Sequence, residues 1–261
     1  MISPEIVNFG PFHLRWYGLC VALGMLAGYL LMAVRSKRYQ LDASKCADIV
    51  FAGMLFGLAG ARLEYVRREW ATQFEGNFVQ IFKIWEGGLS FQGGLILAAV
   101  AIVVMCLWRK WSVLKTADLI TPALLLGHAF GRVGCFLNGC CFGKVYDGFC
   151  AVSYPFLRNS VFPIQLVESL FCLLLCGFFL LLERKNKMAS CFFPLYMVLY
   201  SIGRFFIEYG RGDYADAEAM FTPAQSLFLF VTLPLGALLL VAACLMPQKG
   251  KGAAQKPGRE K

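Results

Sequence analysis

Long apolar stretches divided by short polar connections run through the whole chain. Each of the seven stretches is close to the ~20 residues that a helix needs to cross the hydrocarbon core of a bilayer. They cover residues 16–34, 48–66, 90–108, 116–134, 163–182, 191–209 and 223–246. A chain in lipid must satisfy its backbone hydrogen bonds internally, so each stretch predicts a helix. The pattern therefore predicts an all-α membrane protein with seven transmembrane helices.

The polar connection 67–89 carries a periodic aromatic pattern of its own. Apolar residues recur at spacings of three and four positions, which places them on one face of a helix. They are Phe74, Phe78, Ile81, Phe82 and Trp85. We expect an interfacial helix in the 67–89 loop, with polar residues on its other face. Its aromatic face either lies in lipid or packs on neighbouring helices.

The composition agrees with this class and excludes others. Apolar residues make up 59% of the 261 residues and charged residues only 16%, against about 45–50% and about 25% in soluble domains. A disordered chain and an ordinary soluble domain are excluded. The net charge is +9, but basic residues of membrane proteins gather in cytoplasmic connections. The basic excess therefore needs no nucleic-acid partner.

The distribution of basic residues predicts an orientation. Fifteen Lys and Arg residues fall in the connections and tail on one side of the predicted membrane, and seven fall on the other. The positive-inside rule places the N-terminus outside and the C-terminus in the cytoplasm, which an odd number of helices also requires. Residues 1–246 are expected to form one seven-helix transmembrane domain. The basic, glycine-containing segment 247–261 is expected to be a disordered cytoplasmic tail.

Several ionisable residues interrupt the apolar stretches. They are Arg62, Arg132, Glu168, Arg204 and Glu208. An ionisable group near the bilayer centre costs about 2.5–3.5 kcal/mol on the insertion scale. These groups must therefore form ion pairs, face a hydrated cavity or lie near the interface. Structural ion pairs and a functional site are the two interpretations.

Helical spacing groups some of these residues. Tyr200, Arg204, Glu208 and Arg211 form one polar stripe, and His128 and Arg132 form another. Arginine keeps its charge in lipid and grips a phosphate with two parallel hydrogen bonds. Two arginines on separate membrane helices therefore indicate an anionic ligand such as a lipid phosphate.

Two glycine-rich segments are expected on the outer face. Residues 87–94 open the third predicted helix, and 131–143 close the fourth. Glycine permits close backbone approach, and a helix start at Gln92, Gly93 and Gly94 presents free N–H groups to an anion. Cys135, Cys140, Cys141 and Cys150 also gather here. Metal binding, a disulfide and free thiols remain open for them, although the spacing matches no standard zinc site and no metal is expected.

The motifs taken together resemble one family. They are Arg15 to Leu19, Gly87 to Gly94, Gly131 to Gly134, Asn138-Gly139, Gly143, Pro163 to Leu166 and Tyr200 to Arg211. In this order they resemble the bacterial prolipoprotein diacylglyceryl transferases, multi-pass enzymes of the inner membrane. The resemblance implies transfer of the diacylglyceryl group of phosphatidylglycerol to the lipobox cysteine thiol of a prolipoprotein. A thioether forms and glycerol phosphate is released, without a cofactor. The implied partners are phosphatidylglycerol and prolipoprotein signal peptides within the membrane.

The resemblance and the stripes together give the predicted site. Arg132 corresponds to the phosphatidylglycerol-binding arginine of the family, and Arg204 to a second essential arginine. The predicted catalytic residues are Tyr17, Gln92, His128, Tyr200, Arg204 and Glu208. The predicted substrate-binding residues are Gly93, Gly94, Arg132, Asn138, Gly143 and Glu168.

The chain also departs from the family pattern. Gln92 stands where the family usually has a histidine, Cys135 where it has an asparagine and Phe162 where it has another histidine. A glutamine cannot act as a base. Either His128 or Glu208 serves instead, although Arg204 weakens Glu208 in that role, or nearby arginines activate the substrate thiol. A catalytically impaired relative and a lipid-moving membrane protein are the alternative functions.

Overall fold

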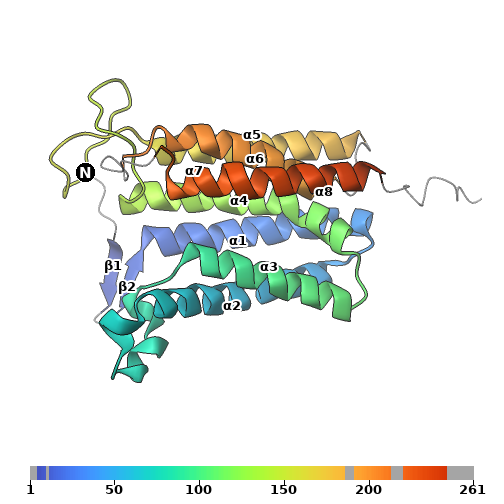
Figure 1. Ribbon diagram of the computed structural model, residues 1–261, viewed down its shortest axis with the longest axis horizontal. Helices are drawn as coiled ribbons and strands as arrows, with labels where there is room; N and C mark the ends of the chain where they lie inside the picture. The colour runs from blue at the N-terminus through green and yellow to red at the C-terminus, as the bar shows by residue number, and fades with distance from the viewer. Residues whose placement is uncertain (1–4, 10–11, 186–190, 213–219, 246–261) are drawn as a thin grey trace, which may run out of the picture.

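The computed structural model describes residues 5–9, 12–185, 191–212 and 220–245. Its long helices lie side by side along one direction (Figure 1). They are α1 Trp16–Arg35, α2 Ala43–Arg68, α3 Phe91–Trp108, α4 Val113–Asn138, α5 Ile164–Arg184, α6 Phe192–Glu208 and the segment α7 Pro223–Leu227, η5 Phe228–Thr232 and α8 Leu233–Leu245. Each of the seven predicted stretches coincides with one of these helices or with the α7–α8 segment. The predicted tail 247–261 lies outside the described residues.

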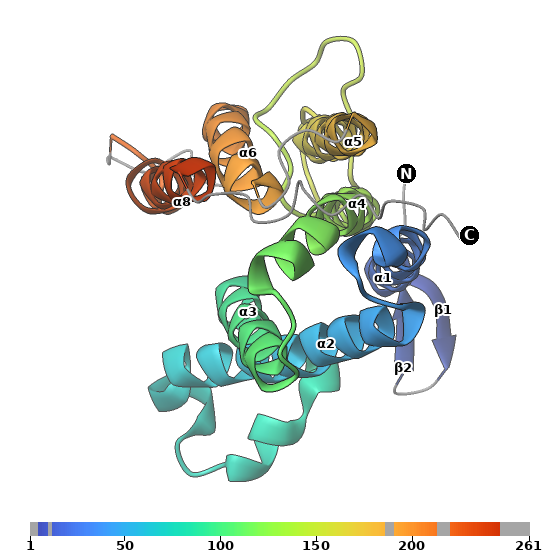
Figure 2. The same cartoon turned by 90° about the vertical axis from the view of Figure 1, so that its right-hand side faces the viewer.

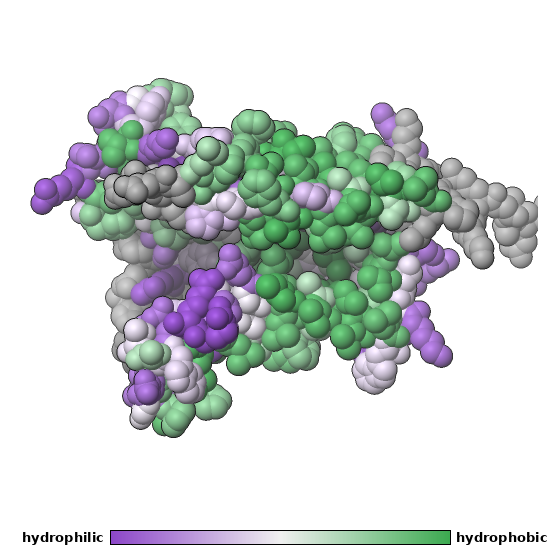
Figure 3. Space-filling model, in the orientation of Figure 1, coloured by the Kyte–Doolittle hydropathy of each residue, from purple (hydrophilic) through white to green (hydrophobic). Residues whose placement is uncertain are grey.

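In the described part of the chain, six helical stretches are long and apolar enough to cross a membrane. They are Trp16–Tyr39, Ala43–Arg68, Phe91–Trp108, Val113–Asn138, Ile164–Arg184 and Pro223–Leu245. The predicted seventh is α6, which has 17 residues and lies between α5 and α8 (Figure 2). An apolar band covers the middle of the molecule, and hydrophilic residues gather at its two ends (Figure 3). The helical membrane fold is confirmed, whereas the seventh crossing and the orientation remain predictions.

A short β-hairpin precedes α1. Strand β1 Glu5–Phe9 pairs antiparallel with β2 Phe12–Arg15. The expectation of a purely α-helical chain missed this hairpin. Its signal is the alternation of apolar and polar residues along β2, since a period of two is typical of a strand. The membrane part of the fold remains helical.

The prediction of a single interfacial helix in the 67–89 loop is wrong. The loop contains three separate short turns: η2 Trp70–Phe74, η3 Phe78–Phe82 and η4 Ile84–Glu86. Gly76 between the first two has a positive φ of 82°, a conformation that a continuous helix cannot contain. The predicted stripe is split accordingly. Phe74 is fully buried, while Phe78 and Phe82 are exposed.

Arg62 explains why this loop folds into turns. Its guanidinium group donates to the backbone carbonyls of Ile81 at 2.9 Å, Gly87 at 2.8 Å and Gly88 at 2.9 Å. It also lies 5.4 Å from the ring centroid of Phe74. Carbonyls that would otherwise bond within a helix are satisfied by this one side chain. Arg62 therefore holds the loop against α2, which favours a structural role for this intramembrane charge.

Glycines let α2 and α3 approach closely. A Cβ added at Gly60 would lie 2.4 Å from the carbonyl oxygen of Gly93, and one added at Gly93 would lie 2.4 Å from Glu64 Cβ. Any larger side chain would force the two helices apart. Gly93 and Gly94 thus have a role in helix contact. Their predicted role in substrate binding stays a prediction.

Charged residues also connect helices at the end of the bundle that lies opposite the 67–89 loop. Arg35 of α1 forms a buried ion pair with Glu183 of α5, with 2.7 Å between Nε and Oε2. Asp118 of α4 accepts hydrogen bonds from the backbone N–H groups of Phe192 and Phe193 at the start of α6. A carboxylate at a helix N-terminus is favourable. These contacts fix α1, α4, α5 and α6 relative to one another.

Candidate functional site

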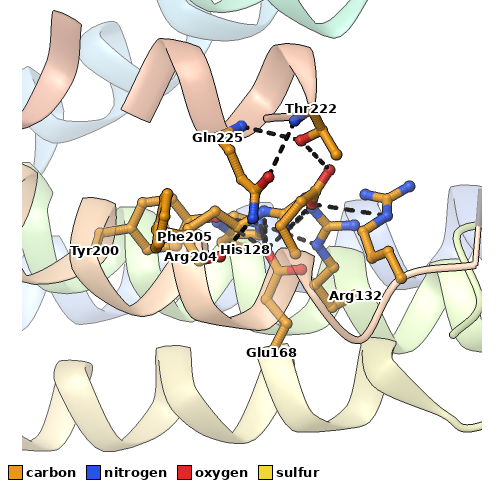
Figure 4. A network of polar contacts seen from close by, with 10 residues as sticks. His128, Arg132, Glu168, Tyr200, Arg204, Phe205, Thr222 and Gln225 are labelled. Carbon is orange, nitrogen blue, oxygen red and sulfur yellow. Dashed lines mark hydrogen bonds and ion pairs between the residues drawn. The ribbon is translucent and has the colours of Figure 1, made fainter. Parts of the chain in front are cut away.

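A buried carboxylate of α5 joins three helices near one end of the bundle. Oε1 of Glu168 accepts a hydrogen bond from the Tyr200 hydroxyl at 2.9 Å. The same oxygen lies 3.0 Å from Nη2 of Arg132 on α4 and 3.5 Å from Nε of Arg204 on α6. The Glu168 side chain is only 2% exposed. Figure 4 shows Arg132, Arg204 and Tyr200 converging on this group.

A second carboxylate extends the network toward the start of α7. Oε2 of Glu208 lies 2.5 Å from Nη1 of Arg204 and 3.9 Å from Nε of Arg211. Its Oε1 accepts a hydrogen bond from the Thr222 hydroxyl at 3.2 Å. Thr222 also caps α7 together with Gln225, each side chain bonding the backbone N–H of the other residue. One continuous set of polar contacts thus links α4, α5, α6 and α7 (Figure 4).

The network gathers several arginines around buried carboxylates. Arg132 and Arg204 lie close to Glu168, while Arg204 and Arg211 lie close to Glu208. Removing a charge from water is expensive unless an opposite charge compensates it. An anionic ligand would add to the compensation that the carboxylates give these guanidinium groups. The Arg132 side chain is 16% exposed against 4% for Arg204, so Arg132 is better placed to meet a ligand.

His128 lies inside the network. Its Nε2 accepts a hydrogen bond from Nε of Arg132 at 3.2 Å and lies 3.4 Å from Oε1 of Glu168. The Tyr200 hydroxyl is 3.5 Å away. This arrangement connects α4 to α6, and the predicted role of His128 as a base stays a prediction.

The loop after α4 brings Gly143 against the end of α6. The Gly143 N–H donates to Phe162 O at 2.9 Å, and Gly143 forms an antiparallel bridge with Arg211. A Cβ on Gly143 would lie 2.6 Å from Phe162 O and 2.9 Å from Gly210 O. Only glycine fits here without moving the backbone. Gly143 therefore sets the position of the loop beside Arg211.

Three cysteines meet where α4 ends. The sulfur atoms of Cys135, Cys140 and Cys141 all lie within 4.8 Å of one another. The thiols of Cys135 and Cys140 hydrogen-bond to Cys141 and, together with the charges of Arg211 and Arg132, hold the pKa of the Cys141 thiol far below its ordinary value. All eleven cysteines of the chain are free. The structure thus brings three of the four predicted cysteines together as thiols, and Cys150 lies outside this group.

The chain is similar to known proteins of one family. A family model described as prolipoprotein diacylglyceryl transferase matches residues 4–242. A phosphatidylglycerol–prolipoprotein diacylglyceryl transferase of Clostridium tetani is 32% identical over 237 residues, covering 89% of this chain and 94% of the relative. The chain belongs to the prolipoprotein diacylglyceryl transferase family. Proteins of the same name from Parasynechococcus marenigrum and Staphylococcus aureus are each 33% identical, and each comparison covers 81% of this chain.

Family membership confirms the resemblance seen in the motifs. The chain is a multi-pass protein of the bacterial cytoplasmic membrane, as predicted. The predicted classification as a transferase is confirmed as well. The roles of individual residues remain predictions, and the structure groups the predicted site residues as follows.

The predicted residues described here fall into three groups. Those in the network are His128, Arg132, Glu168, Tyr200, Arg204 and Glu208. Tyr17 and Asn138 lie beside the cysteines, since both interact with Cys140. Arg211 and Thr222 were not among the predicted site residues. The spacing of Arg211 from Glu208 could have indicated their contact. The contact between Glu208 and Thr222 joins two different helices, so the sequence gives no signal for it.

Gln92, Gly93 and Gly94 form the third group, at the start of α3. Oε1 of Gln92 accepts a hydrogen bond from Nη2 of Arg68 at 2.6 Å, and its side chain is exposed. Among the contacts of the described residues, no hydrogen bond or ion pair joins Gln92 to the network. The position that usually holds the family histidine thus lies on the α2–α3 pair. In this chain the cationic side chain of Arg68 donates a hydrogen bond to the glutamine at that position.

Proposed function

We propose that this protein transfers the diacylglyceryl group of phosphatidylglycerol to the thiol of a prolipoprotein's lipobox cysteine, forming a thioether and releasing glycerol phosphate. Family membership supports the reaction. The observation that carries the site is the network in which Arg132 and Arg204 share the Glu168 carboxylate. The guanidinium group of Arg132, the more exposed of these two arginines, suits the phosphate of this lipid.

The reaction is a displacement at a tetrahedral carbon. It needs a thiolate, neutralisation of the departing phosphate and alignment of the three reacting atoms. Arg132 meets the phosphate because it is the more exposed of the two arginines that contact Glu168. Glu168 and Tyr200 hold Arg132 and Arg204 in place, and the predicted substrate-binding role of Glu168 and catalytic role of Tyr200 stay predictions. A preformed charge of this kind stabilises the leaving group without reorganising during the reaction.

We also infer that the site faces the outside of the cell. The positive-inside distribution of Lys and Arg supports this, because the end of the bundle with Arg35 and Lys185 is the more basic one. Seven crossings, with α6 as the sixth, then place the start of α1 and the end of α6 on the outer side. A phosphatase reporter fused after Lys185 is expected to be inactive, as a cytoplasmic location requires. High reporter activity there would contradict the orientation.

The activity is tested by rescue of a host cell. In a bacterium depleted of its own transferase, expression of this protein should restore growth and attach labelled acyl chains to a prolipoprotein. A prolipoprotein whose lipobox cysteine is replaced with serine should remain unlabelled. Absence of both growth and label, with the protein present in the membrane, would exclude the enzymatic function.

One observation favours a second candidate. Gln92 cannot act as a base and is bonded to Arg68, as a catalytically impaired relative with a binding role would allow. The same rescue separates the two functions, because an impaired relative gives neither growth nor label. A lipid-moving protein would also give no label on the prolipoprotein.

A further inference from the structure

The three cysteines at the end of α4 form a built cluster. Helix α4 ends at Gly139, which has a φ of 68°, and the Cys140 N–H donates to Cys135 O at 3.1 Å. This left-handed cap turns the chain back over the last helical turn. It places Cys140 and Cys141 beside Cys135, with all three sulfur atoms within 4.8 Å of one another.

Neighbouring residues hold this geometry. Nε2 of Gln165, a fully buried side chain of α5, donates to Cys140 O at 2.8 Å. Cys141 has a φ of 59°, a backbone conformation that non-glycine residues adopt at a cost and only where their surroundings impose it. The cluster is therefore fixed from α4, from α5 and from the loop between them.

The charges around the cluster suit metal-bound thiolates. Arg132 interacts favourably with Cys135 and Cys141, and Arg211 with Cys141. Three thiolates and one Zn²⁺ carry a net charge of −1, for which a neighbouring guanidinium group is a favourable environment. Zn–S bonds of about 2.3 Å put the sulfurs of a tetrahedral site roughly 3.8 Å apart. The observed separations need to close by no more than about 1 Å to reach this value.

Three protein ligands leave the fourth position of tetrahedral zinc open, as in catalytic zinc sites. We propose that Cys135, Cys140 and Cys141 bind Zn²⁺, and that its open position takes the prolipoprotein thiol as a thiolate. This inference rests on the proposed function, since the thiol of that reaction must lose its proton. A thiol that coordinates zinc is deprotonated. The site thus supplies the activation that Gln92 cannot.

The step balances without any other reagent. The prolipoprotein thiol binds the metal and releases its proton to water. The sulfur lone pair then forms a bond to the glyceryl carbon while the bond from that carbon to the phosphate oxygen breaks, and glycerol phosphate leaves with the electron pair beside Arg132. The product thioether carries no charge and is a weak ligand, so it dissociates from the metal.

Metal binding is tested on the full-length protein in detergent, reduced and freed of metal. One Zn²⁺ per chain is expected by elemental analysis, and Co²⁺ should give thiolate-to-metal absorption that shifts when a lipobox peptide containing cysteine is added. The Cys135→Ser, Cys140→Ser and Cys141→Ser variants should each lose tight Zn²⁺ binding. Cys150→Ser, in the same loop but outside the cluster, is the matched control and should retain it. Zn²⁺ binding equal in the wild type and the cluster variants, or a disulfide between cluster cysteines in the protein as isolated, would overturn the site.

Activity separates this inference from the proposed function. Removing the metal should lower the rate of transfer by roughly 10²–10⁴-fold, which is the typical contribution of proton removal from a nucleophile. Adding Zn²⁺ back should restore the rate. Full transfer by metal-free protein would overturn the zinc role and leave the transferase function standing. Stoichiometric Zn²⁺ binding with a peptide-dependent Co²⁺ spectrum, but no transfer under any condition, would confirm the site and contradict the transferase function.

Discussion

Replacement of Arg132 with alanine is expected to abolish rescue of a transferase-depleted cell and to lower transfer in membranes by about 10³-fold or more. Arg132 is the more exposed of the two arginines that contact Glu168, so under the proposed function its loss removes the guanidinium group that binds the phosphate. Loss of one preorganised donor to a developing anion commonly costs about 10²–10³-fold. Loss of a full charge in a site shielded from water costs more. The measurement is label transferred to a prolipoprotein per amount of membrane-inserted protein.

Two further variants sharpen this result. Arg132→Lys keeps the charge but loses the two parallel hydrogen bonds of a guanidinium group, so transfer should lie between that of wild type and that of Arg132→Ala. Arg158→Ala removes an exposed arginine from the loop after α4 and should transfer normally. Undiminished rescue by Arg132→Ala would remove Arg132 from the site.

The helices could be predicted from the sequence because each apolar stretch has the length of a crossing. Their ends could not. The predicted stretch 48–66 is in fact α2, Ala43–Arg68, because charged residues such as Lys45 and Arg67 are tolerated where a helix leaves the hydrocarbon. The prediction for the 67–89 loop failed for a different reason. Its helical period was real, but contacts from Arg62 and the positive φ at Gly76 decided the backbone.

The site, too, could be predicted only in part from the sequence. Helical spacing alone places Arg204 beside Glu208, and it places His128 beside Arg132. Spacing gives no information about which helices are neighbours, so the central position of Glu168 between α4 and α6 could not be read from it. In the motif that contains Gln92, the sequence pattern was assigned to a different role from the one that the structure shows. Its glycines were expected at an anion, whereas Gly93 lies against Gly60 of α2, because close helix contact also requires glycine.

Replacement of Glu168 with glutamine should destabilise the protein strongly. Glu168 is 2% exposed and lies close to Arg132 and Arg204. Without its charge, Arg132 and Arg204 lose the buried carboxylate that they share. Removing one partner of a buried ion pair typically costs 3–5 kcal/mol, which corresponds to a fall in Tm on the order of 10 °C for a chain of this size. Thermal unfolding of the detergent-solubilised protein is the measurement.

Glu64→Gln is the matched control for this change. Glu64 of α2 also pairs with two arginines, Arg67 and Arg68, at 2.8 Å and 3.0 Å. These arginines are 71% and 50% exposed, so water replaces the lost contacts and Tm should change little. The comparison keeps the residue type and the number of paired arginines constant, while Glu168 differs in its burial and in its added contacts with Tyr200 and His128. Equal melting of the two variants would mean that Glu168 does not hold α4, α5 and α6 together. A selective loss of stability in Glu168→Gln would show that the same carboxylate that orients Arg132 and Arg204 also joins the helices that carry them.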